Sequence, residues 1–282
     1  MRWPWESTEP LKNRLALVTG AGSGIGRATS LAFAAAGARV LAVDIDLDAA
    51  RRTAEEAGGA AIAMTADVGD ARAMETLAER VISDYGPLDL LVNNAGVGAA
   101  GPFLETTVED WQRVLDVNLW GVIHGCRLFA PAMVARGRGH IVNVASAAAW
   151  VPLRDMAAYC TSKAAVLMLG DCLRPELAPH GVFVTSICPG IVATNITRSA
   201  RFVGTDAAGE AALRDTASQW YGRRNFPPER VAEAIVQAVH DRAETVAVTP
   251  EAQFVHGLAR FAPMALQALA GLGALPRRKE ES

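Results

Sequence analysis

The chain has 282 residues, of which 51% are hydrophobic and 20% charged, and its formal net charge is −3. This length allows one large domain or two small ones, and the absence of a block of like charges argues against a nucleic-acid surface. The four cysteines, Cys126, Cys160, Cys172 and Cys188, are irregularly spaced without a C-x-x-C. We therefore expect reduced thiols in a cytoplasmic protein, with neither a metal site nor a disulfide framework.

Two kinds of targeting segment are not expected. Residues 1–9 lack a basic start followed by an apolar run, so we do not expect a secretory signal there. No stretch offers about 20 uninterrupted apolar residues, which is what a membrane-spanning helix needs.

The first unit predicted along the chain is a strand, a glycine-rich turn and a helix. Residues 14–19 (RLALVT) are short and apolar and lead into glycine, which is typical of a buried parallel strand. The turn TGAGSGIG covers 19–26, and 27–36 is rich in alanine with a helical pattern. Glycines in such a turn let the backbone approach a pyrophosphate, which the free N–H groups of the helix would bind. An ordinary tight turn is the alternative, but the flanking elements favour a dinucleotide site containing Gly20, Gly24 and Gly26.

The second predicted strand, 39–43 (RVLAV), is followed by an acid. Asp44 lies 24 residues after Gly20, roughly the spacing at which a carboxylate binds the ribose hydroxyls of NAD. The same carboxylate would repel the 2′-phosphate of NADP, and neither Ser23 nor Ile45 supplies an arginine for that phosphate. We therefore expect NAD rather than NADP; a plain turn residue is the alternative for Asp44.

Strand and helix patterns continue to alternate along the rest of the chain. Further strands are predicted at 60–66, 88–92, 139–144, 182–187 and 245–248, and helices at 46–57, 70–84, 107–136, around Tyr159 and at 228–241. This order predicts a doubly wound α/β fold of the Rossmann type, with about seven parallel strands and helices on both faces. In such folds functional residues gather beyond the carboxyl ends of the strands. The candidates at those ends are Gly20, Asp44, Asp67, Asn94, Ser146 and Gly190.

Tyr159 and Lys163 are spaced to share one face of a helix. They lie four residues apart in YCTSK, one helical turn from each other. The ammonium would favour the phenolate, and lowering the tyrosine pKa from near 10 toward neutral needs about 4 kcal/mol. A chance pair on a solvated helix is the alternative for this motif alone. The preceding glycine turn, Asp44 and Ser146 favour a proton-transfer site instead.

Together, TGAGSGIG, Asp67-Val68, NNAG, Asn118, Ser146, YCTSK and PG-x-x-x-T resemble the short-chain dehydrogenase/reductase family in its single-domain form, over about residues 11–249. The resemblance implies that Tyr159 is the general acid/base and that Lys163 lowers its pKa and holds the nicotinamide ribose. It further implies that Ser146 positions the substrate oxygen and that Asn118, at a helix irregularity, keeps a water linked to Lys163. Ser146 and Tyr159 would contact the substrate. The implied cofactor contacts are Gly20, Ser23, Gly24, Ile25, Gly26, Asp44, Asp67, Val68, Asn94, Ala95, Gly96, Tyr159, Lys163, Pro189, Gly190, Val192 and Thr194.

The expected organisation is an N-terminal extension at 1–11, a dehydrogenase domain at 12–249 and an apolar C-terminal extension with a charged tail at 250–282. Within the domain, 195–228 is the least regular region and corresponds to the family's variable substrate lid. By resemblance, the helix containing 111–133 and the Tyr159 helix would form the interface of a homodimer or homotetramer.

The lid and the segment before Tyr159 favour an apolar substrate. Phe202, Trp220, Tyr221 and Phe226 would form an apolar wall or else pack in the core, and Ala147, Val151, Leu153 and Met156 precede the catalytic helix. We therefore expect a lipophilic secondary alcohol or ketone, such as a steroid, a terpenoid or an acyl ketone. The lid arginines leave a substrate carboxylate or phosphate open; they are Arg198, Arg201, Arg223 and Arg224.

The C-terminal stretch 261–275 has no charged residue. It could cover the substrate cleft, pack on a neighbouring subunit, or make a peripheral membrane contact with Arg277, Arg278 and Lys279 at the headgroups. Packing or cleft cover is favoured, because Pro263 and the three glycines after Pro250 (Gly257, Gly271 and Gly273) argue against a long regular helix.

The sequence thus predicts an NAD-dependent oxidoreductase that interconverts a secondary alcohol and a ketone. One alternative is an epimerase- or dehydratase-type relative, although these usually have another glycine spacing and a larger C-terminal substrate domain. A second is a non-catalytic NAD-binding regulatory protein, which would be expected to lose part of the Asn–Ser–Tyr–Lys set. His124, His140 and His180 have no partner pattern, and we interpret them as structural.

Overall fold

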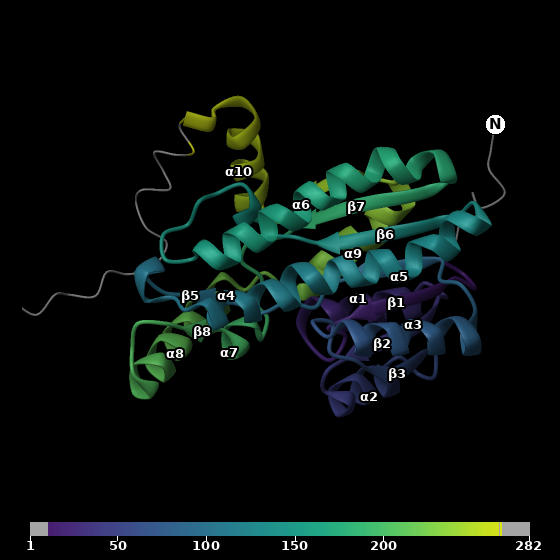
Figure 1. Cartoon of the computed structure of the whole chain (residues 1–282), viewed down its shortest axis with the longest axis horizontal. Helices are drawn as coiled ribbons and strands as arrows, with labels where there is room; N and C mark the ends of the chain where they lie inside the picture. Colours follow the sequence, from purple (N-terminus) through teal and green to yellow (C-terminus); the bar gives the residue numbers. More distant parts are fainter. Residues whose placement is uncertain (1–10, 265, 267–282) are drawn as a thin grey trace, which may run out of the picture.

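A seven-stranded parallel sheet forms the centre of the computed structural model, which describes residues 11–264 and residue 266, without the side chains of Arg198, Ser199, Trp220, Tyr221 and Arg223 (Figure 1). The strand order is β3-β2-β1-β4-β6-β7-β9, and each neighbouring pair is parallel. The strands are β1 (Leu15–Thr19), β2 (Arg39–Asp44), β3 (Ala61–Thr65), β4 (Leu90–Asn93), β6 (Gly139–Val144), β7 (Val182–Cys188) and β9 (Thr245–Ala247). The predicted doubly wound α/β fold is confirmed.

Helices cover both faces of this sheet. The longer helices of the described chain are α1 (Gly24–Ala35), α2 (Leu47–Glu56), α3 (Ala71–Tyr85), α4 (Val108–Leu115), α5 (Gly121–Arg136), α6 (Ala157–Leu177), α8 (Ala207–Arg224), α9 (Pro228–Asp241) and α10 (Pro250–Phe261). Helices α3, α5 and α6 pack on one face, where Phe129 and Val166 meet Leu17 of β1. Helices α1 and α9 pack on the other, where Phe33 and Ile235 share a core with strand residues of opposite orientation. The strands are apolar on both sides because both sides are covered.

Acidic and hydroxyl side chains cap the N-termini of several helices, close to the residues where these helices were expected to begin. The Asp46 and Asp70 carboxylates each accept two backbone N–H groups at the start of α2 and α3. Thr107 and Asp110 form a reciprocal capping box at the start of α4. Such caps fix where the chain turns from a strand end into the next helix.

Two helices differ in their bounds from the sequence expectations. Helix α1 begins at Gly24, so Gly24 and Gly26 lie in its first turn rather than before it. The helix expected at 107–136 is interrupted by a π-helical turn, Asp116–Trp120, which contains Asn118. The helix irregularity expected there is therefore confirmed.

The region 195–228 was wrongly expected to be irregular. It contains α7 (Ile196–Ser199), the short strand β8 (Arg201–Phe202) and the 18-residue helix α8. Helix α8 is rich in alanine and has high intrinsic helix propensity, but it lacks a continuous apolar stripe. The periodicity that reveals most helices is therefore missing from its sequence.

In the part of the chain that the structure describes, no helix has the length and apolar character needed to cross a bilayer. Helix α10 ends at Phe261, so most of the stretch 261–275, and the basic residues after it, lie outside the described residues.

Candidate active site

A cleft of about 1040 Å³ opens at the carboxyl ends of the strands. It is lined by every residue predicted to bind the cofactor except Gly26, and it also includes Ser146. Segments as far apart in sequence as Gly20 and Val255 thus meet at one edge of the sheet, because parallel strands all end there. Asn118 and Gly26 stand behind the cleft wall rather than in it.

The glycine turn after β1 has the geometry of a phosphate cradle. Gly20 has a positive φ of 65°, which a side chain would disfavour. A Cβ on Gly26 would lie 2.1 Å from the Gly20 carbonyl oxygen, so α1 can approach the turn only with glycine there. Gly26 therefore sets the close packing of helix on strand, and the N-terminus of α1 faces the cleft lined by Ser23, Gly24 and Ile25.

Asp44 is fixed at the end of β2 by two backbone N–H groups. Its Oδ2 atom accepts from Gly22 at 2.8 Å, and its Oδ1 atom accepts from Asp46 at 3.0 Å. Each carboxylate oxygen can accept a further hydrogen bond. The acid therefore both shapes the glycine turn and presents acceptors to the cleft, which fits the ribose end of a dinucleotide.

Asn94 ties the end of β4 to the glycine turn. Its side-chain Nδ2 donates to the Thr19 carbonyl oxygen at 2.8 Å, and its backbone N–H donates to Thr19 Oγ1 at 3.0 Å. The backbone of Ala95 also donates to that hydroxyl, at 3.1 Å. Asn94 thus holds the floor of the cleft in place. On the adjoining wall, the Asp67 carboxylate accepts from the Gly69 N–H and Val68 is buried.

Ser146, Tyr159 and Lys163 line the same cleft. Ser146 follows β6, and its Oγ accepts the Ala148 N–H at 3.1 Å, which leaves the hydroxyl proton available to another acceptor. Lys163 is only 4% exposed, and its Nζ donates to the Val144 carbonyl oxygen at 2.9 Å. Burial lowers the pKa of Lys163 from 10.5 to about 8.

Asn118 supports this set from the π-helical turn. Its amide accepts from the Val97 N–H at 2.8 Å and donates to the Val97 carbonyl oxygen at 3.0 Å and to Ser162 Oγ at 3.1 Å. A Cβ on Gly96 would lie 3.2 Å from Asn118 Oδ1 and 3.5 Å from Lys163 Nζ. The two polar groups therefore both lie beside Gly96. The water expected between them stays a prediction.

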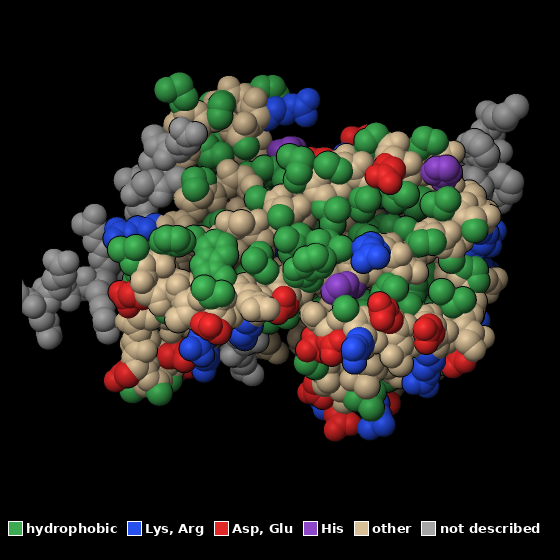
Figure 2. Space-filling view, viewed as in Figure 1, with side chains coloured by type: hydrophobic (Ala, Val, Ile, Leu, Met, Phe, Trp, Pro, Cys, Tyr) green, Lys and Arg blue, Asp and Glu red, His purple; other side chains and the backbone are tan. Residues whose placement is uncertain are grey.

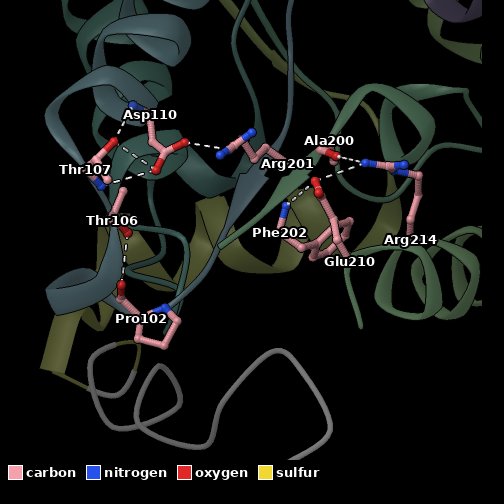
Figure 3. A network of polar contacts seen from close by, with 9 residues as sticks. All are labelled: Pro102, Thr106, Thr107, Asp110, Ala200, Arg201, Phe202, Glu210 and Arg214. Carbon is pink, nitrogen blue, oxygen red and sulfur yellow. Dashed lines mark hydrogen bonds and ion pairs between the residues drawn. The ribbon is translucent and has the colours of Figure 1, made fainter. Parts of the chain in front are cut away.

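The lid is attached to the domain by main-chain pairing and by charged contacts (Figure 3). Strand β8 pairs in parallel with β5 (Ala99–Ala100). Arg201 Nε lies 2.7 Å from Asp110 Oδ1, on the acid that also caps α4. Glu210 of α8 accepts from the Phe202 N–H at 3.2 Å and from Arg214 at 3.0 Å. These contacts place Phe202 in the cleft wall.

The other aromatic residues expected in the lid wall differ from Phe202. Phe226 packs against the core under α1 and α9 and does not line the cleft, so for this residue the packing alternative holds. The side chains of Trp220 and Tyr221, like those of Arg198 and Arg223, lie outside those described. Arg224 is exposed, and Arg201 is paired with Asp110.

Several lining residues were not expected from the sequence. Helix α8 contributes Leu213, Thr216 and Ala217, and helix α10 contributes Glu251 and Val255. The one local signal for α10 was Thr-Pro at 249–250, an N-cap followed by a proline in the first turn. Nothing in the spacing connected that helix with the cleft.

Such a cleft defines a class: a dinucleotide-binding α/β protein whose ligand lies across the carboxyl ends of parallel strands. The sequence profile of one family in this class, described as short chain dehydrogenase, matches residues 14–202. The chain belongs to this family, as its motifs indicated.

Three curated relatives show how broad the similarity is. The chain is 48% identical over 264 residues to the probable oxidoreductase EphD of Mycobacterium tuberculosis, covering 92% of this chain and 45% of that protein. It is 37% identical over 231 residues to the D-threitol dehydrogenase of Mycolicibacterium smegmatis, covering 81% and 86%. It is also 37% identical over 246 residues to 3beta-hydroxysteroid dehydrogenase 1 of Eggerthella lenta, covering 86% and 92%. The chain therefore spans about half the length of the first relative.

Two solved structures share the fold. A short-chain dehydrogenase/reductase from Burkholderia phymatum in complex with NAD superimposes with a TM-score of 0.80 at 31% identity, covering 89% of this chain and 92% of that one. A metagenomic short-chain oxidoreductase in complex with NADP gives 0.70 at 30% identity, covering 85% and 98%. Both hold a nicotinamide cofactor, the type expected for this chain.

Replacing Lys163 with methionine should stabilise the cofactor-free protein at pH 7. The folded state holds the Lys163 proton less tightly than the unfolded chain, because burial lowers its pKa from 10.5 to about 8. That difference corresponds to about 3 kcal/mol, and the lost hydrogen bond to Val144 offsets about 1 kcal/mol. We therefore expect Lys163→Met to raise the free energy of unfolding by about 2 kcal/mol, measured by urea denaturation.

The stability advantage of Lys163→Met over the wild type should decrease as the pH rises. Between about pH 8 and 10.5 the folded wild type has released the proton while the unfolded chain still binds it, so wild-type stability rises over this range. Arg72→Met, at an exposed residue of α3, serves as the control. A Lys163→Met variant that is less stable than wild type at pH 7, by an amount that does not change up to pH 10, would contradict this account.

Proposed function

We propose that the protein is an NAD-dependent oxidoreductase that interconverts a secondary alcohol and a ketone. The observation that carries this proposal is that Ser146, Tyr159 and Lys163 line one cleft with the glycine turn and Asp44. A bound nicotinamide cofactor would accept or supply the hydride, and the protein has to orient the substrate and manage one proton. The fit of the cleft supports such a cofactor: its wall combines the Gly20 turn, the start of α1 and the acceptors of Asp44.

In this mechanism Tyr159 is the proton acceptor for alcohol oxidation. The hydroxyl proton of the substrate passes to the Tyr159 phenolate as the C–H hydride leaves, and reduction of the ketone returns that proton. Lys163 carries its charge at neutral pH, since its pKa is about 8, and that charge favours the phenolate. Ser146 donates a hydrogen bond to the substrate oxygen where charge develops.

The substrate we propose is a lipophilic secondary alcohol or ketone. Beyond the cofactor end, the cleft is lined by apolar side chains from three segments, the loop after Ser146, the region 195–228 and helix α10: Val151, Leu153, Met156, Phe202, Leu213 and Val255. The names of the relatives include both a polyol dehydrogenase and a hydroxysteroid dehydrogenase, so the lining and not the relatives favours the apolar class.

The test compares alcohols of both classes. Wild-type protein with NAD should form NADH faster with a hydroxysteroid or a long-chain secondary alcohol than with D-threitol or sorbitol, followed by absorbance. Tyr159→Phe should lower kcat by about 100- to 10,000-fold, because it removes the general base. Tyr85→Phe, on α3, is the matched control and should keep wild-type activity. Equal activity of the wild type and Tyr159→Phe would refute the mechanism, and turnover of polyols alone would refute the substrate class.

Asp44 should set the preference for NAD over NADP. Asp44→Asn keeps an oxygen acceptor for the Gly22 N–H but removes the charge that would repel a 2′-phosphate. Since a hydrogen bond to a charged group contributes about 1.5–3 kcal/mol, we expect the NAD:NADP ratio of kcat/KM to fall by about 10- to 100-fold. A wild type that prefers NADP, or an unchanged ratio in Asp44→Asn, would show that Asp44 does not select the cofactor.

We also propose that the protein forms homodimers or homotetramers through α5 and α6. Hydrophobic side chains gather over these two helices on the face shown in Figure 2. Met168 on α6 is 61% exposed, and Trp120, the residue just before α5, is 46% exposed. Exposed apolar groups on adjoining helices are typical of an interface between subunits. Met168→Asp should therefore shift the sedimentation coefficient toward that of a monomer, whereas Arg72→Asp on α3 should not; a wild type that sediments as a monomer would contradict the proposal.

A further inference from the structure

Helix α10 starts at the cleft, outside the segment 14–202 that matches the family. Thr249, which is fully buried, caps this helix: its Oγ1 accepts the Ala252 N–H at 3.3 Å. The same oxygen accepts the Gly190 N–H at 3.1 Å. The cap therefore joins α10 to the Pro189–Gly190 turn that follows β7.

Glu251 makes a second contact with that turn. Its Oε1 accepts the Ile191 N–H at 2.9 Å, across 60 residues of sequence. A Cβ on Gly190 would lie 2.4 Å from Thr249 Oγ1 and 2.6 Å from Glu251 Oε1. The turn and the helix are thus in contact so close that only glycine fits between them, and Glu251 lines the cleft beside the turn.

Helix α10 also contacts the loop that carries Ser146. The His256 ring stacks on Trp150 at 4.5 Å between centroids, with an angle of 16° between the planes. Trp150 closes the 3₁₀ turn that starts at Ser146. The two loops are joined directly as well, because the Ala147 N–H donates to the Pro189 carbonyl oxygen at 2.8 Å. One helix therefore braces both loops that form this side of the site.

We propose that Glu251 is a positioning residue, whose carboxylate holds the Gly190–Ile191 turn in the conformation that receives the nicotinamide end of the cofactor. A backbone N–H that donates to a carboxylate forms a stronger bond than one that donates to a neutral acceptor. Without this acceptor the Ile191 amide has no hydrogen-bond partner among the residues that the structure describes, and the turn loses one of the two side-chain hydrogen bonds that join it there to Thr249 and Glu251. The inference rests on the proposed function in one respect: it takes this turn as the nicotinamide-side wall of the cleft.

The experiment compares four variants in two readouts that need no substrate. Glu251→Ala removes the acceptor, Glu251→Asp keeps the charge but shortens its reach, and Glu251→Gln keeps an acceptor of equal reach without the charge. Gln253→Ala, at an exposed residue of the same helix, is the control. The readouts are the Kd for NADH, from fluorescence titration, and amide hydrogen exchange of residues 188–194 in the cofactor-free protein.

We expect Glu251→Ala and Glu251→Asp to bind NADH about tenfold more weakly, the effect of losing one hydrogen bond to a charged acceptor. Both should also exchange the Ile191 amide faster than the wild type does. Glu251→Gln should stay within about threefold of the wild type in Kd and retain protection at Ile191, and Gln253→Ala should change neither readout. If Glu251→Ala does not fold, the comparison of Glu251→Asp with Glu251→Gln tests the positioning role.

Equal NADH affinity of Glu251→Asp and Gln253→Ala would overturn the positioning role. A second result would also overturn it: a Glu251→Gln variant that binds NADH as weakly as Glu251→Asp does while its Ile191 amide stays protected. The charge of Glu251, and not the position of the turn, would then determine the affinity for NADH. If the wild type binds NADH but oxidises no secondary alcohol, the proposed function is refuted. The positioning role of Glu251 is still tested by the NADH affinities of its variants. A wild type that binds no NADH overturns both.

Discussion

The site depends on one buried ammonium group. Lys163 is held at the end of β6 by the Val144 carbonyl oxygen, in surroundings that lower its pKa to about 8. Placing a charge there costs stability, because burial disfavours the charged form. The structure accepts that cost at the point where the charge can act on Tyr159, one helical turn away. Under the proposed mechanism, stability and function thus oppose each other at this residue, as they often do at active sites.

Hydrogen bonds of Asn118 join the segments around this group. Val97 is bonded twice by the Asn118 amide, whose Nδ2 also reaches Ser162 on the helix of Lys163. The π-helical turn at 116–120 directs Asn118 toward these partners, and π-turns inside helices frequently occur at functional sites. An ordinary α-helix through this region would rotate the amide away from them.

The sequence predicted most of the site because its signals are local. The glycine turn, Asp44 and the Tyr159–Lys163 pair each depend on a spacing within one βα unit, and parallel strands bring their ends together without further information. The region 195–228 could not be predicted in the same way, since α8 lacks an apolar stripe. Nor does the sequence distinguish its two phenylalanines: Phe202 lines the cleft, whereas Phe226 packs against the core. Glu251 left no signal, because its partner Ile191 is 60 residues away.

The apolar wall of the cleft is built from three segments, and each is anchored to the frame by a polar contact. The loop after Ser146 is joined to Pro189 through the Ala147 N–H, and the lid is joined to α4 through Arg201 and Asp110. Helix α10 is joined to the Ile191 turn through Glu251. Directional contacts fix each segment at its base, so the apolar side chains beyond can change in size without moving Tyr159. Such a division would let the wall vary around a fixed Tyr159, and relatives of similar identity have names as different as threitol and hydroxysteroid dehydrogenase.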